Sequence, residues 1–519
     1  MKKIIFTIIM VIILAGSSVF AACAPKTTGS EGTLTVAVGT LGDEVWLADK
    51  ATSPEHIVLS HIGDAMFQKD ENGKLTPGLV EKWEISPDGL AWTFHLRKGV
   101  QFHDGWGEFT VEDFIATYEL CMDEAAANIR SSWYRSTLDR FEVVDPYTVI
   151  IHTKKPAFDL AYNLARVIPR MPIASKKYID SVGIEEARRH PIGTGPFKFV
   201  EHKVGEYVEM EAVEDHWRKT PAFKTVIVRI VPEDSTRMSM LRTGEADIIE
   251  ISLDFKEEMA KAGLKTKSVP GAGNAWVQLG GIYLPDRPGY DPNIPWFLPN
   301  EPERALKVRK ALNLAVNRGE LVEHILMGEG APSPIPHVFP GEEAFNPAWK
   351  PYPYDPDEAK KLLAEAGYPD GFPVTVALVP QAGRPYSKLI GEAVGNYWAQ
   401  IGLDVSFESI DYASWRERGF ARDYGQEAWC YAAPRYDEPI VMISVQHWSK
   451  GRVIYGIEHP TLDQLIEAGN AELDYTKRQQ TARQIGDFLY DGYWDVPTCY
   501  YNGIFGISGK VGDWPIIPY

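Results

Sequence analysis

The alternation of hydrophobic and polar residues along the chain predicts several β-strands. In the segment TLTVAV, Leu34, Val36 and Val38 take every second position, so they share one face of a strand. The segment EYVEMEAV, residues 206–213, alternates in the same way. The segment TVIVRIVP, residues 225–232, is rich in β-branched residues and is also predicted to be a strand.

Turn and capping residues predict where other elements begin and end. Residues 83–96, WEISPDGLAWTFHL, have two strand-like runs on either side of a Pro-Asp-Gly sequence, which predicts a hairpin. The helix predicted over residues 110–122 has Thr110 in the N-cap position. Asp113 follows three residues later, where a negative charge favours the exposed N–H groups of the first turn.

The segment YDPDEAKKLLAEAGYPDGF, residues 354–372, predicts a helix with both ends marked. Asp355 is the expected N-cap, Pro356 the first helical residue, and Glu358 completes a capping box. Gly367 is expected to end the helix. A strand, a helix and a second strand are predicted to follow at 374–379, 387–402 and 403–410. Mixed α/β architecture is therefore expected.

The beginning of the chain predicts export. Lys2 and Lys3 precede a short apolar run and then small residues ending in FAAC, which is the pattern of a secretory signal peptide. FAAC resembles a bacterial lipobox, so Cys23 is the predicted lipidation site, although Phe20 stands where an aliphatic residue is usual. Ordinary cleavage after an alanine is the alternative. A lipid on Cys23 would hold the protein on a membrane surface without a transmembrane helix.

Length and charge limit the classes of function. The 519 residues are 45% hydrophobic and 24% charged, which predicts two or three globular domains. A net charge of −18 argues against nucleic acid as a partner. Besides Cys23, the cysteines are Cys121, Cys430 and Cys499; they lack a C-x-x-C spacing and are expected to be small buried residues.

The sequence has no positive indication of catalysis. His56 and His61 are five residues apart and His103 adjoins Asp104, but no set of three or four ligands has the spacing of a zinc site. The GTGPF sequence at 193–197 lacks the remaining residues of a phosphate-binding loop, and no G-x-S-x-G occurs. No metal, cofactor or catalytic residue is therefore predicted.

Aromatic residues favour a ligand-binding role. The chain has 15 Trp and 24 Tyr, and several lie in segments predicted to be irregular, among them GNAWVQLGG (273–281) and DYASWRERGF (411–420). Residues 427–439, EAWCYAAPRYDEP, combine three rings with a cysteine and two prolines and are predicted to form a shaped loop. Rings in loops supply apolar faces with polar edges, which suits a binding site.

The order of longer motifs resembles the solute-binding proteins of ABC importers in the oligopeptide/dipeptide/nickel group. The matching segments follow the family order over nearly the whole chain after the signal. They are LTPGLVEKWEISPDGLAWTFHLRKGVQFHDG, FTVEDFIATYEL, HPIGTGPFKFVEHKVGEYVEMEAVEDHW, MLRTGEADI, KVRKALNLAVNRGELVEHILMGEGAP and YDPDEAKKLLAEAGYPDGF. Each motif is weak by itself, and their order makes the resemblance strong.

The resemblance implies a bilobed α/β fold of the periplasmic-binding-protein type, in its large three-domain form, with a cleft that closes by hinge motion. The expected domains are a signal with lipobox (1–23), a tether (24–32), lobe I (33–75, 191–285 and 498–519), an inserted domain II (76–190) and lobe III (286–497). The implied function is capture of an extracellular solute and its delivery to the importer's permease and ATPase subunits. The protein is expected to be a monomeric lipoprotein on the outer face of a cell membrane.

The segment 427–439 departs from the family at one important point. In peptide-binding members an aspartate shortly after the Trp-Cys pair holds the peptide's ammonium, but here Tyr431 and two alanines follow Trp429 and Cys430. Asp437 is the nearest acid. If it does not serve, a buried ammonium would lack its counter-charge, and Arg435 would favour a carboxylate, phosphate or sugar hydroxyl instead.

Peptide is the leading ligand, with saccharides, opine-like compounds and metal chelates as alternatives, and a secreted hydrolase as the rival class. The residues that the resemblance places at the ligand are Glu55, His56, Asn274, Trp276, Tyr386, Tyr412, Trp415, Trp429, Cys430, Arg435 and Asp437.

Overall fold

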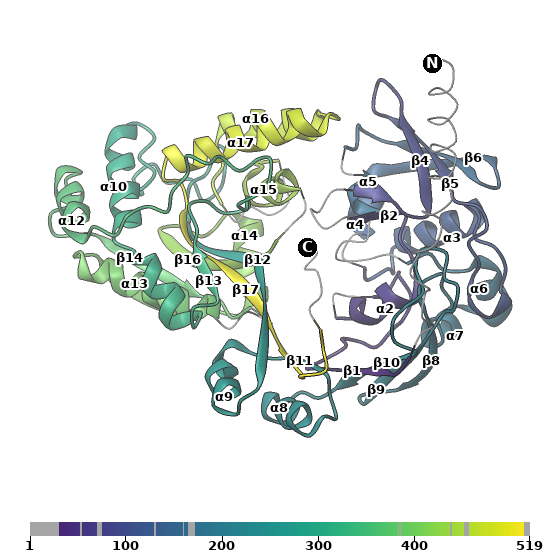
Figure 1. Ribbon diagram of the computed structural model, residues 1–519. Helices are drawn as coiled ribbons and strands as arrows, with labels where there is room; N and C mark the ends of the chain where they lie inside the picture. Colours follow the sequence, from purple (N-terminus) through teal and green to yellow (C-terminus); the bar gives the residue numbers. More distant parts are fainter. Residues whose placement is uncertain are drawn as a thin grey trace, which may run out of the picture.

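The molecule consists of two halves that lie side by side and share one large sheet at one end (Figure 1). The N-terminal half comprises residues 31–264 and the C-terminal half residues 280–495. The computed structural model describes residues 31–51, 54–69, 75–128, 131–158, 160–164, 172–381, 384, 386–435, 438–450 and 456–512.

One large sheet runs through both halves. Its strands are β1 (Thr33–Val38), β8 (Phe197–Lys203), β9 (Tyr207–Ala212), β10 (Thr225–Ile230), β11 (Ile248–Glu250), β12 (Lys265–Leu279), β13 (Gly330–Pro332), β14 (Pro373–Leu378), β15 (Asp404–Ser409), β16 (Glu427–Pro434) and β17 (Val496–Ile507). Within the described residues their order is β15-β14-β16-β12-β17-β11-β1-β10-β9-β8, and β13 pairs with β17 beside this path. The strands predicted at 33–38, 206–213 and 225–232 are confirmed as β1, β9 and β10.

The long strands β12 and β17 connect the two halves. They pair antiparallel from Lys265 opposite Ile507 to Val277 opposite Val496. The pairing is interrupted between Val269 and Gly273, where β12 has two more residues than β17. A bulge of this kind bends a strand and increases its twist, so the sheet changes direction where the halves meet.

A second sheet forms the outer part of the N-terminal half. Its strands are β4 (Val80–Ile85), β5 (Ala91–Leu96), β6 (Leu138–Asp145) and β7 (Thr148–Thr153), in the order β4-β5-β7-β6; β2 (Phe67–Lys69) and β3 (Leu75–Pro77) pair separately. The hairpin predicted over 83–96 is confirmed, because β4 and β5 pair antiparallel across its turn. We call this sheet and the core packed on it the small-sheet unit.

Helices cover the sheets. Their bounds are α2 (His56–Ile62), α3 (Val111–Met122), α4 (Ser131–Thr137), α5 (Leu160–Asn163), α6 (Lys176–Val182), α7 (Ile184–Arg189), α8 (Asp234–Thr243), α9 (Lys256–Lys261), α10 (Pro302–Leu314), α11 (Arg318–Glu320), α12 (Pro356–Glu365), α13 (Tyr386–Gln400), α14 (Tyr412–Ala421), α15 (Pro439–His447), α16 (Pro460–Ala471) and α17 (Tyr475–Asp491), with the short turns η1 (His103–Gly105), η2 (Leu253–Phe255) and η3 (Leu321–Ile325).

The predicted helix ends are confirmed where capping residues marked them. Thr110 and Asp113 form a reciprocal capping box at the start of α3. Asp355 accepts a hydrogen bond from the Glu358 N–H at 3.0 Å at the start of α12, and Gly367 takes a positive φ of 84° just after its end. The predicted β-α-β order is also confirmed, since β14 and β15 pair in parallel on either side of α13.

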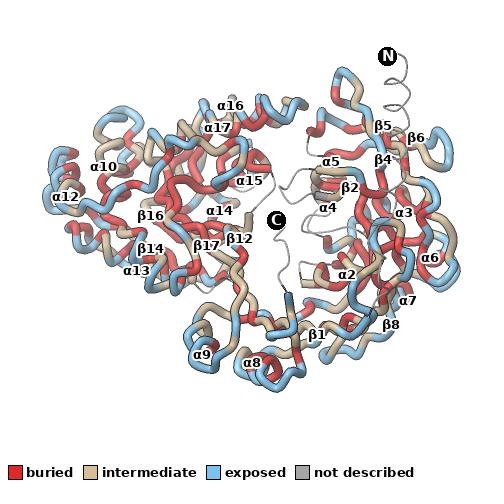
Figure 2. Tube along the Cα trace, viewed as in Figure 1, coloured by how far each residue is buried: buried red, intermediate tan, exposed pale blue. Residues whose placement is uncertain are grey.

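Each half has its own apolar core, and buried residues lie in both halves (Figure 2). The largest lies in the C-terminal half, where α10, α12 and α13 pack against β12, β14 and β16. A second core belongs to the small-sheet unit, and a third lies between α2 and the strands β1, β8, β9 and β10. The predicted domain boundaries remain a prediction.

Residues 427–439 are not the loop that was predicted, because residues 427–434 form strand β16. This strand lies inside the sheet between β12 and β14. Both of its faces are largely buried, so it lacks the alternation of polar and apolar residues that identifies a half-exposed strand. The rings of 273–281 and 411–420 also lie on regular elements, in β12 and α14.

The cysteines that the structure describes, Cys121, Cys430 and Cys499, are free and buried, as predicted. In the described part of the chain, no helix is both long and apolar enough to cross a membrane.

The close packing of β12 on its neighbours at Gly273 predicts that an added methyl group there destabilises the protein. A Cβ on Gly273 would lie 2.1 Å from the Tyr501 hydroxyl and 2.3 Å from the Ala433 carbonyl oxygen, two atoms that form a hydrogen bond of 2.8 Å. We expect Gly273→Ala to lower the free energy of unfolding by roughly 1–3 kcal/mol, because the strands must separate.

Urea denaturation measures this change, and Gly503→Ala on β17 is the matched control. A Cβ there would be 3.6 Å from its nearest neighbour, the Ala272 side chain. Equal stability of the two variants would contradict the proposed steric constraint.

Candidate functional site

Strands β12 and β16 bring several predicted site residues onto one face of the large sheet. In their antiparallel pairing Asn274 lies opposite Ala433, Trp276 opposite Tyr431, and Gln278 opposite Trp429. Directly paired residues point to the same side of a sheet, and the residues between them point to the other side. Asn274, Trp276 and Trp429 therefore share a face, to which Tyr431 also belongs.

The rings on this face pack against one another. The Trp276 and Tyr431 ring centroids are 5.3 Å apart, and Trp415 of α14 lies 5.9 Å from Tyr431 and 5.6 Å from Trp429. Tyr412 stands 5.6 Å from Trp415. We call these five residues the aromatic face. Its three tryptophans are fully buried, whereas Tyr431 and Tyr412 remain partly exposed, so the tyrosines are the rings that a solute can reach.

Beside the aromatic face lies a group of buried polar side chains, which we call the polar cluster: His337, Gln446, His447 and Asp495. The His337 ring is 4.6 Å from the Trp276 ring and 5.8 Å from that of His447. His447 Nε2 is 4.0 Å from Asp495 Oδ2. Trp276 Nε1 donates to Gln278 Oε1 at 3.0 Å, and Gln278 Nε2 donates to Asp495 Oδ1 at 2.7 Å.

Six side-chain atoms of the polar cluster have no hydrogen-bond partner among the described residues. They are both ring nitrogens of His337, both amide atoms of Gln446, Nε2 of His447 and Oδ2 of Asp495. On β12, Nδ2 of the buried Asn274 also has no hydrogen-bond partner among the described residues. Because an unpartnered buried polar atom is costly, a concentration of them beside a ring surface indicates a place that water or a polar ligand group completes.

Burial shifts the pKa values of Asp495, His447 and His337 in the direction that favours their neutral forms. Loss of solvation raises the pKa of Asp495 to about 7, against a smaller opposing effect of the hydrogen bond from Gln278. The same loss lowers the pKa of His447 to about 3 and holds that of His337 well below its usual value. Both imidazoles are therefore neutral hydrogen-bonding groups.

The structure places two other predicted residues on the opposite face of the sheet. Cys430 alternates with Trp429 and Tyr431 and packs in the main core of the C-terminal half, close to Gly391 of α13. Tyr386, the first residue of α13, contacts Tyr501 on that same side with 4.9 Å between ring centroids. These two side chains cannot line a surface together with the aromatic face.

Arg435 follows β16 directly and already has a counter-charge within the chain. Its Nε and Nη2 each lie 2.9 Å from Glu342 Oε1, and its guanidinium covers the Phe339 ring at 5.0 Å. An anionic solute would have to compete with Glu342 for this cation. Asp437, the acid expected to hold a peptide ammonium, lies outside the described residues.

Glu55 and His56 lie in the other half of the molecule, at the start of α2 (Figure 1). Both are buried, and Glu55 Oε1 accepts a hydrogen bond from the Asp43 N–H at 2.7 Å. Glu55 thus fixes the loop before α2, and a role of either residue at the ligand requires that the two halves approach each other.

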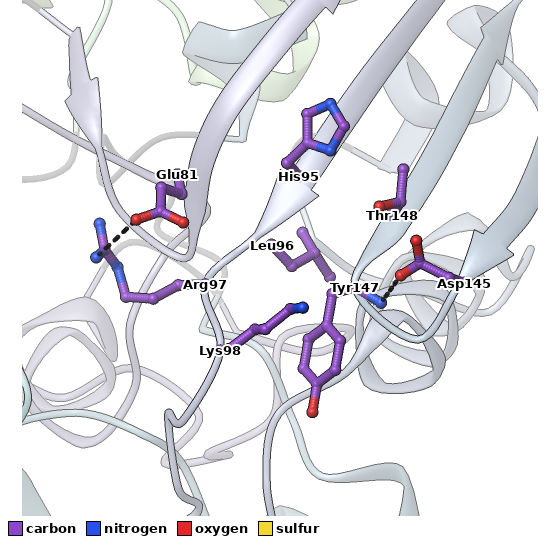
Figure 3. Close-up of a pocket in the computed structure, with 8 residues that line it drawn as sticks. All are labelled: Glu81, His95, Leu96, Arg97, Lys98, Asp145, Tyr147 and Thr148. Atoms are coloured by element: carbon purple, nitrogen blue, oxygen red, sulfur yellow. Dashed lines mark hydrogen bonds and ion pairs between the residues drawn. The ribbon is translucent and has the colours of Figure 1, made fainter.

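A hollow of about 380 Å³ on the small-sheet unit is a separate feature (Figure 3). Its cations have local partners: Arg97 is 3.7 Å from Glu81, and Lys98 lies 5.1 Å above the Tyr147 ring. The aromatic face lies in the other half of the molecule, so we do not connect the two. In the part of the chain that the structure describes, no cluster of His, Cys, Asp or Glu could hold a metal ion.

Sequence reasoning missed the polar cluster. Its members stand at positions 337, 446, 447 and 495, on separate elements, and no motif links them. The only local sign is the proline-rich run PSPIPHVFPG around His337, which predicts an irregular path.

Comparison with known proteins matches most of the chain. Residues 74–446 match the sequence profile described as bacterial extracellular solute-binding proteins, family 5 Middle. The heme-binding protein A of Haemophilus influenzae is 31% identical over 370 residues, which cover 66% of this chain and 63% of that protein. The match thus spans less than two thirds of the relative's length.

Solved structures have the same fold. HbpA2 from Haemophilus parasuis superposes with a TM-score of 0.80 at 22% identity, covering 94% of this chain and 98% of the other. The ABC transporter-associated periplasmic binding protein DppA from Helicobacter pylori, in complex with the peptide STSA, gives 0.70 at 24% identity, with 94% and 96% covered. The predicted periplasmic-binding-protein type of α/β fold is therefore confirmed.

The polar cluster predicts a pH dependence of stability. The pKa of Asp495 is raised from 3.8 to about 7 in the folded protein, so between these pH values the unfolded chain releases a proton that the folded chain retains. The contribution of Asp495 to stability therefore falls as pH rises from about 4 to 7. We expect Asp495→Asn to be more stable than the wild type at pH 8 and to gain much less at pH 4.

Guanidinium denaturation at both pH values measures this difference, and Asn can still accept the hydrogen bond from Gln278. An equal effect of the substitution at pH 4 and pH 8 would refute the raised pKa.

Proposed function

Because the chain belongs to the family of bacterial extracellular solute-binding proteins, family 5, we propose that it captures a solute outside the cytoplasm and delivers it to an ABC transporter. The partners in this role are the transporter's permease and its ATPase subunits. The family consists of binding proteins, and the proposal includes no catalytic step.

The observation that carries this proposal within the molecule is the aromatic face with its adjoining polar cluster. Tyr431 and Tyr412 supply partly exposed ring surface. The unpartnered atoms of Gln446 and His337 supply hydrogen-bonding capacity without a fixed charge. A few polar groups set in ring-rich surface are typical of sites for small organic ligands.

Closure of the two halves completes the proposed site. Asn274, Trp276, Trp415 and Trp429 form or support the wall in the C-terminal half, and Glu55 and His56 face it from the N-terminal half when the hinge at β12 and β17 bends. Ligand binding favours the closed state by its greater affinity for it. Cys430 and Tyr386 act behind the wall, through packing.

A peptide is the solute class that we propose. Neutral hydrogen-bonding groups suit amides, and Arg435, paired with Glu342, is not a free receptor for anions. The similar fold of DppA in complex with a peptide supports the same class. Asp437 remains the proposed partner of the peptide ammonium.

Native mass spectrometry of the exported protein, followed by denaturing release, tests the ligand class. A series of masses that fragments into amino acids is the expected result. A single mass without amino acid fragments would replace peptide by a saccharide, an opine-like compound or a metal chelate, and a released product that changes during hours of incubation would indicate a hydrolase.

The aromatic face gives a mutational prediction. We expect Tyr431→Ala to retain less co-purified solute than the wild type, corresponding to roughly 1 kcal/mol or more of lost binding energy, because a stacking surface is removed. Tyr354→Ala, an exposed tyrosine elsewhere in the C-terminal half, is the control and should retain wild-type amounts. Equal retention by both variants would exclude Tyr431 from the site.

We propose that lipidation of Cys23, which lies outside the described residues, anchors the protein to the membrane. Cys23→Ser should move the protein from the membrane fraction to the soluble exported fraction, because the thioether to the lipid cannot form. Fractionation and intact mass of both forms measure this. A wild-type mass without lipid would establish ordinary signal cleavage instead.

A further inference from the structure

One short segment of the chain divides its side chains between the two halves of the molecule. Ala157, Leu160, Ala161 and Leu164 pack in the core of the small-sheet unit. Phe158, between them in sequence, packs instead in the main core of the C-terminal half, whose other buried members begin at Ala275. We call residues 157, 158 and 160–164 the bridging segment. It connects units whose sheets share no strand among the described residues.

The bridging segment packs against Arg478 of α17. Its guanidinium carbon lies 4.4 Å from the centroid of the Phe158 ring and 6.0 Å from that of Tyr162. Tyr475, one turn earlier in α17, lies 5.6 Å from the same guanidinium and stacks on Tyr162 at 6.5 Å. The cation is thus surrounded by rings from both halves, an arrangement that is stronger when it is shielded from water. Figure 1 shows α16 and α17 extending toward α5.

The other side of Arg478 contacts Glu438 at the start of α15. Its Nε lies 3.3 Å from Glu438 Oε2, and Gln479 Nε2 donates to Glu438 Oε1 at 2.8 Å. Glu438 is the N-cap residue of α15 and directly follows residues 435–437. Arg478 Nη1 also donates to the Glu472 carbonyl at 2.9 Å, which fixes the guanidinium in place. Glu438 and Arg478 are both only 2% exposed.

We propose that Arg478 is a latch that couples closure of the two halves to the position of the start of α15. When the halves close, Phe158 and Tyr162 cover the guanidinium and strengthen its ion pair with Glu438, because a charge pair gains energy when water is excluded. Glu438 then holds the start of α15 in one position. When the halves separate, the pair is exposed to water and weakens. This proposal rests on the proposed function.

A contact near the latch supports its position at a separable interface. The turn of the β4–β5 hairpin touches the chain between α16 and α17: a Cβ on Gly89 would be 2.9 Å from Leu473 Cδ1. These contacts of the small-sheet unit with Leu473, Tyr475 and Arg478 are made by ring, methyl and guanidinium groups, which can part without breaking a strand pairing.

Distances between two spin labels test the latch without knowledge of the ligand. The full chain with Cys23→Ser receives cysteines at Val143 on β6 and Leu389 on α13, two exposed positions in opposite halves. The native cysteines that the structure describes are buried and should not react. Pulsed electron paramagnetic resonance then measures the distribution of distances between the two labels. It is recorded for the protein as purified and after exhaustive dialysis to remove small molecules.

Two variants each remove a different part of the latch: the charge of Arg478 or the ring of Phe158. Arg478→Met removes the charge and keeps the length of the side chain, and Phe158→Leu removes the ring but leaves the pair of Arg478 with Glu438 intact. In each variant, the fraction of molecules with a long distance between the two spin labels should be at least about twofold higher than in the wild type. Arg478→Lys, which keeps the charge without the planar fork, should restore part of the short-distance population.

Arg483→Met is the matched control. Arg483 lies on the same helix, but its guanidinium donates to the carbonyls of Ala344 and Phe345 within the C-terminal half. Its distance distribution should equal that of the wild type. Circular dichroism of each variant establishes that the fold is retained.

The outcomes separate the latch from the proposed function. If Phe158→Leu and Arg478→Met both give the wild-type distribution, the latch is wrong, whatever solute the protein holds. If no solute co-purifies with the wild type and none from a peptide mixture binds, the proposed function fails, and the distances still decide whether Arg478 holds the halves together.

Discussion

The pairing of β12 with β17 is the constraint on which the rest of the structure depends. These two strands belong to one continuous sheet, yet their ends lie in different halves of the molecule. Neither strand can move far without the other, so we expect relative motion of the halves to be concentrated at the bulge between Val269 and Gly273. The same strand β12 then continues into the aromatic face through Asn274 and Trp276. The mechanical connection and the candidate site are therefore built on successive residues of one strand.

Strand alternation decides which residues can act together at that site. If residues 427–435 formed a loop, adjacent side chains such as Trp429 and Cys430 could contact the same ligand. Because this segment is an interior strand, its side chains are divided between a ring-lined face and an apolar core. The ring-lined face has the polar cluster beside it, in which burial keeps two imidazoles neutral. The site is consequently rich in hydrogen-bonding groups and poor in fixed charge.

Two arginines near the end of β16 and the start of α15 are paired with carboxylates. Arg435, which directly follows β16, pairs with Glu342, and Arg478 pairs with Glu438, the N-cap residue of α15. The first pair is partly exposed and the second is buried. Phe158 and Tyr162 of the bridging segment reach Arg478 from the small-sheet unit. The pair of Arg478 with Glu438 therefore connects a contact between the two halves to the start of α15.

The sequence by itself determined the α/β class, the family resemblance and the elements whose ends have a local cause. Thr110 and Asp113, Asp355 and Gly367, and the Pro-Asp-Gly turn of the hairpin act through hydrogen bonds and φ angles within a few residues, so the sequence carries them. Only the tertiary structure decided that β16 is an interior strand, that Cys430 faces away from Trp429, and that His337, His447 and Asp495 meet. These outcomes depend on which strands pair and on contacts between residues far apart in the sequence, which no local pattern encodes.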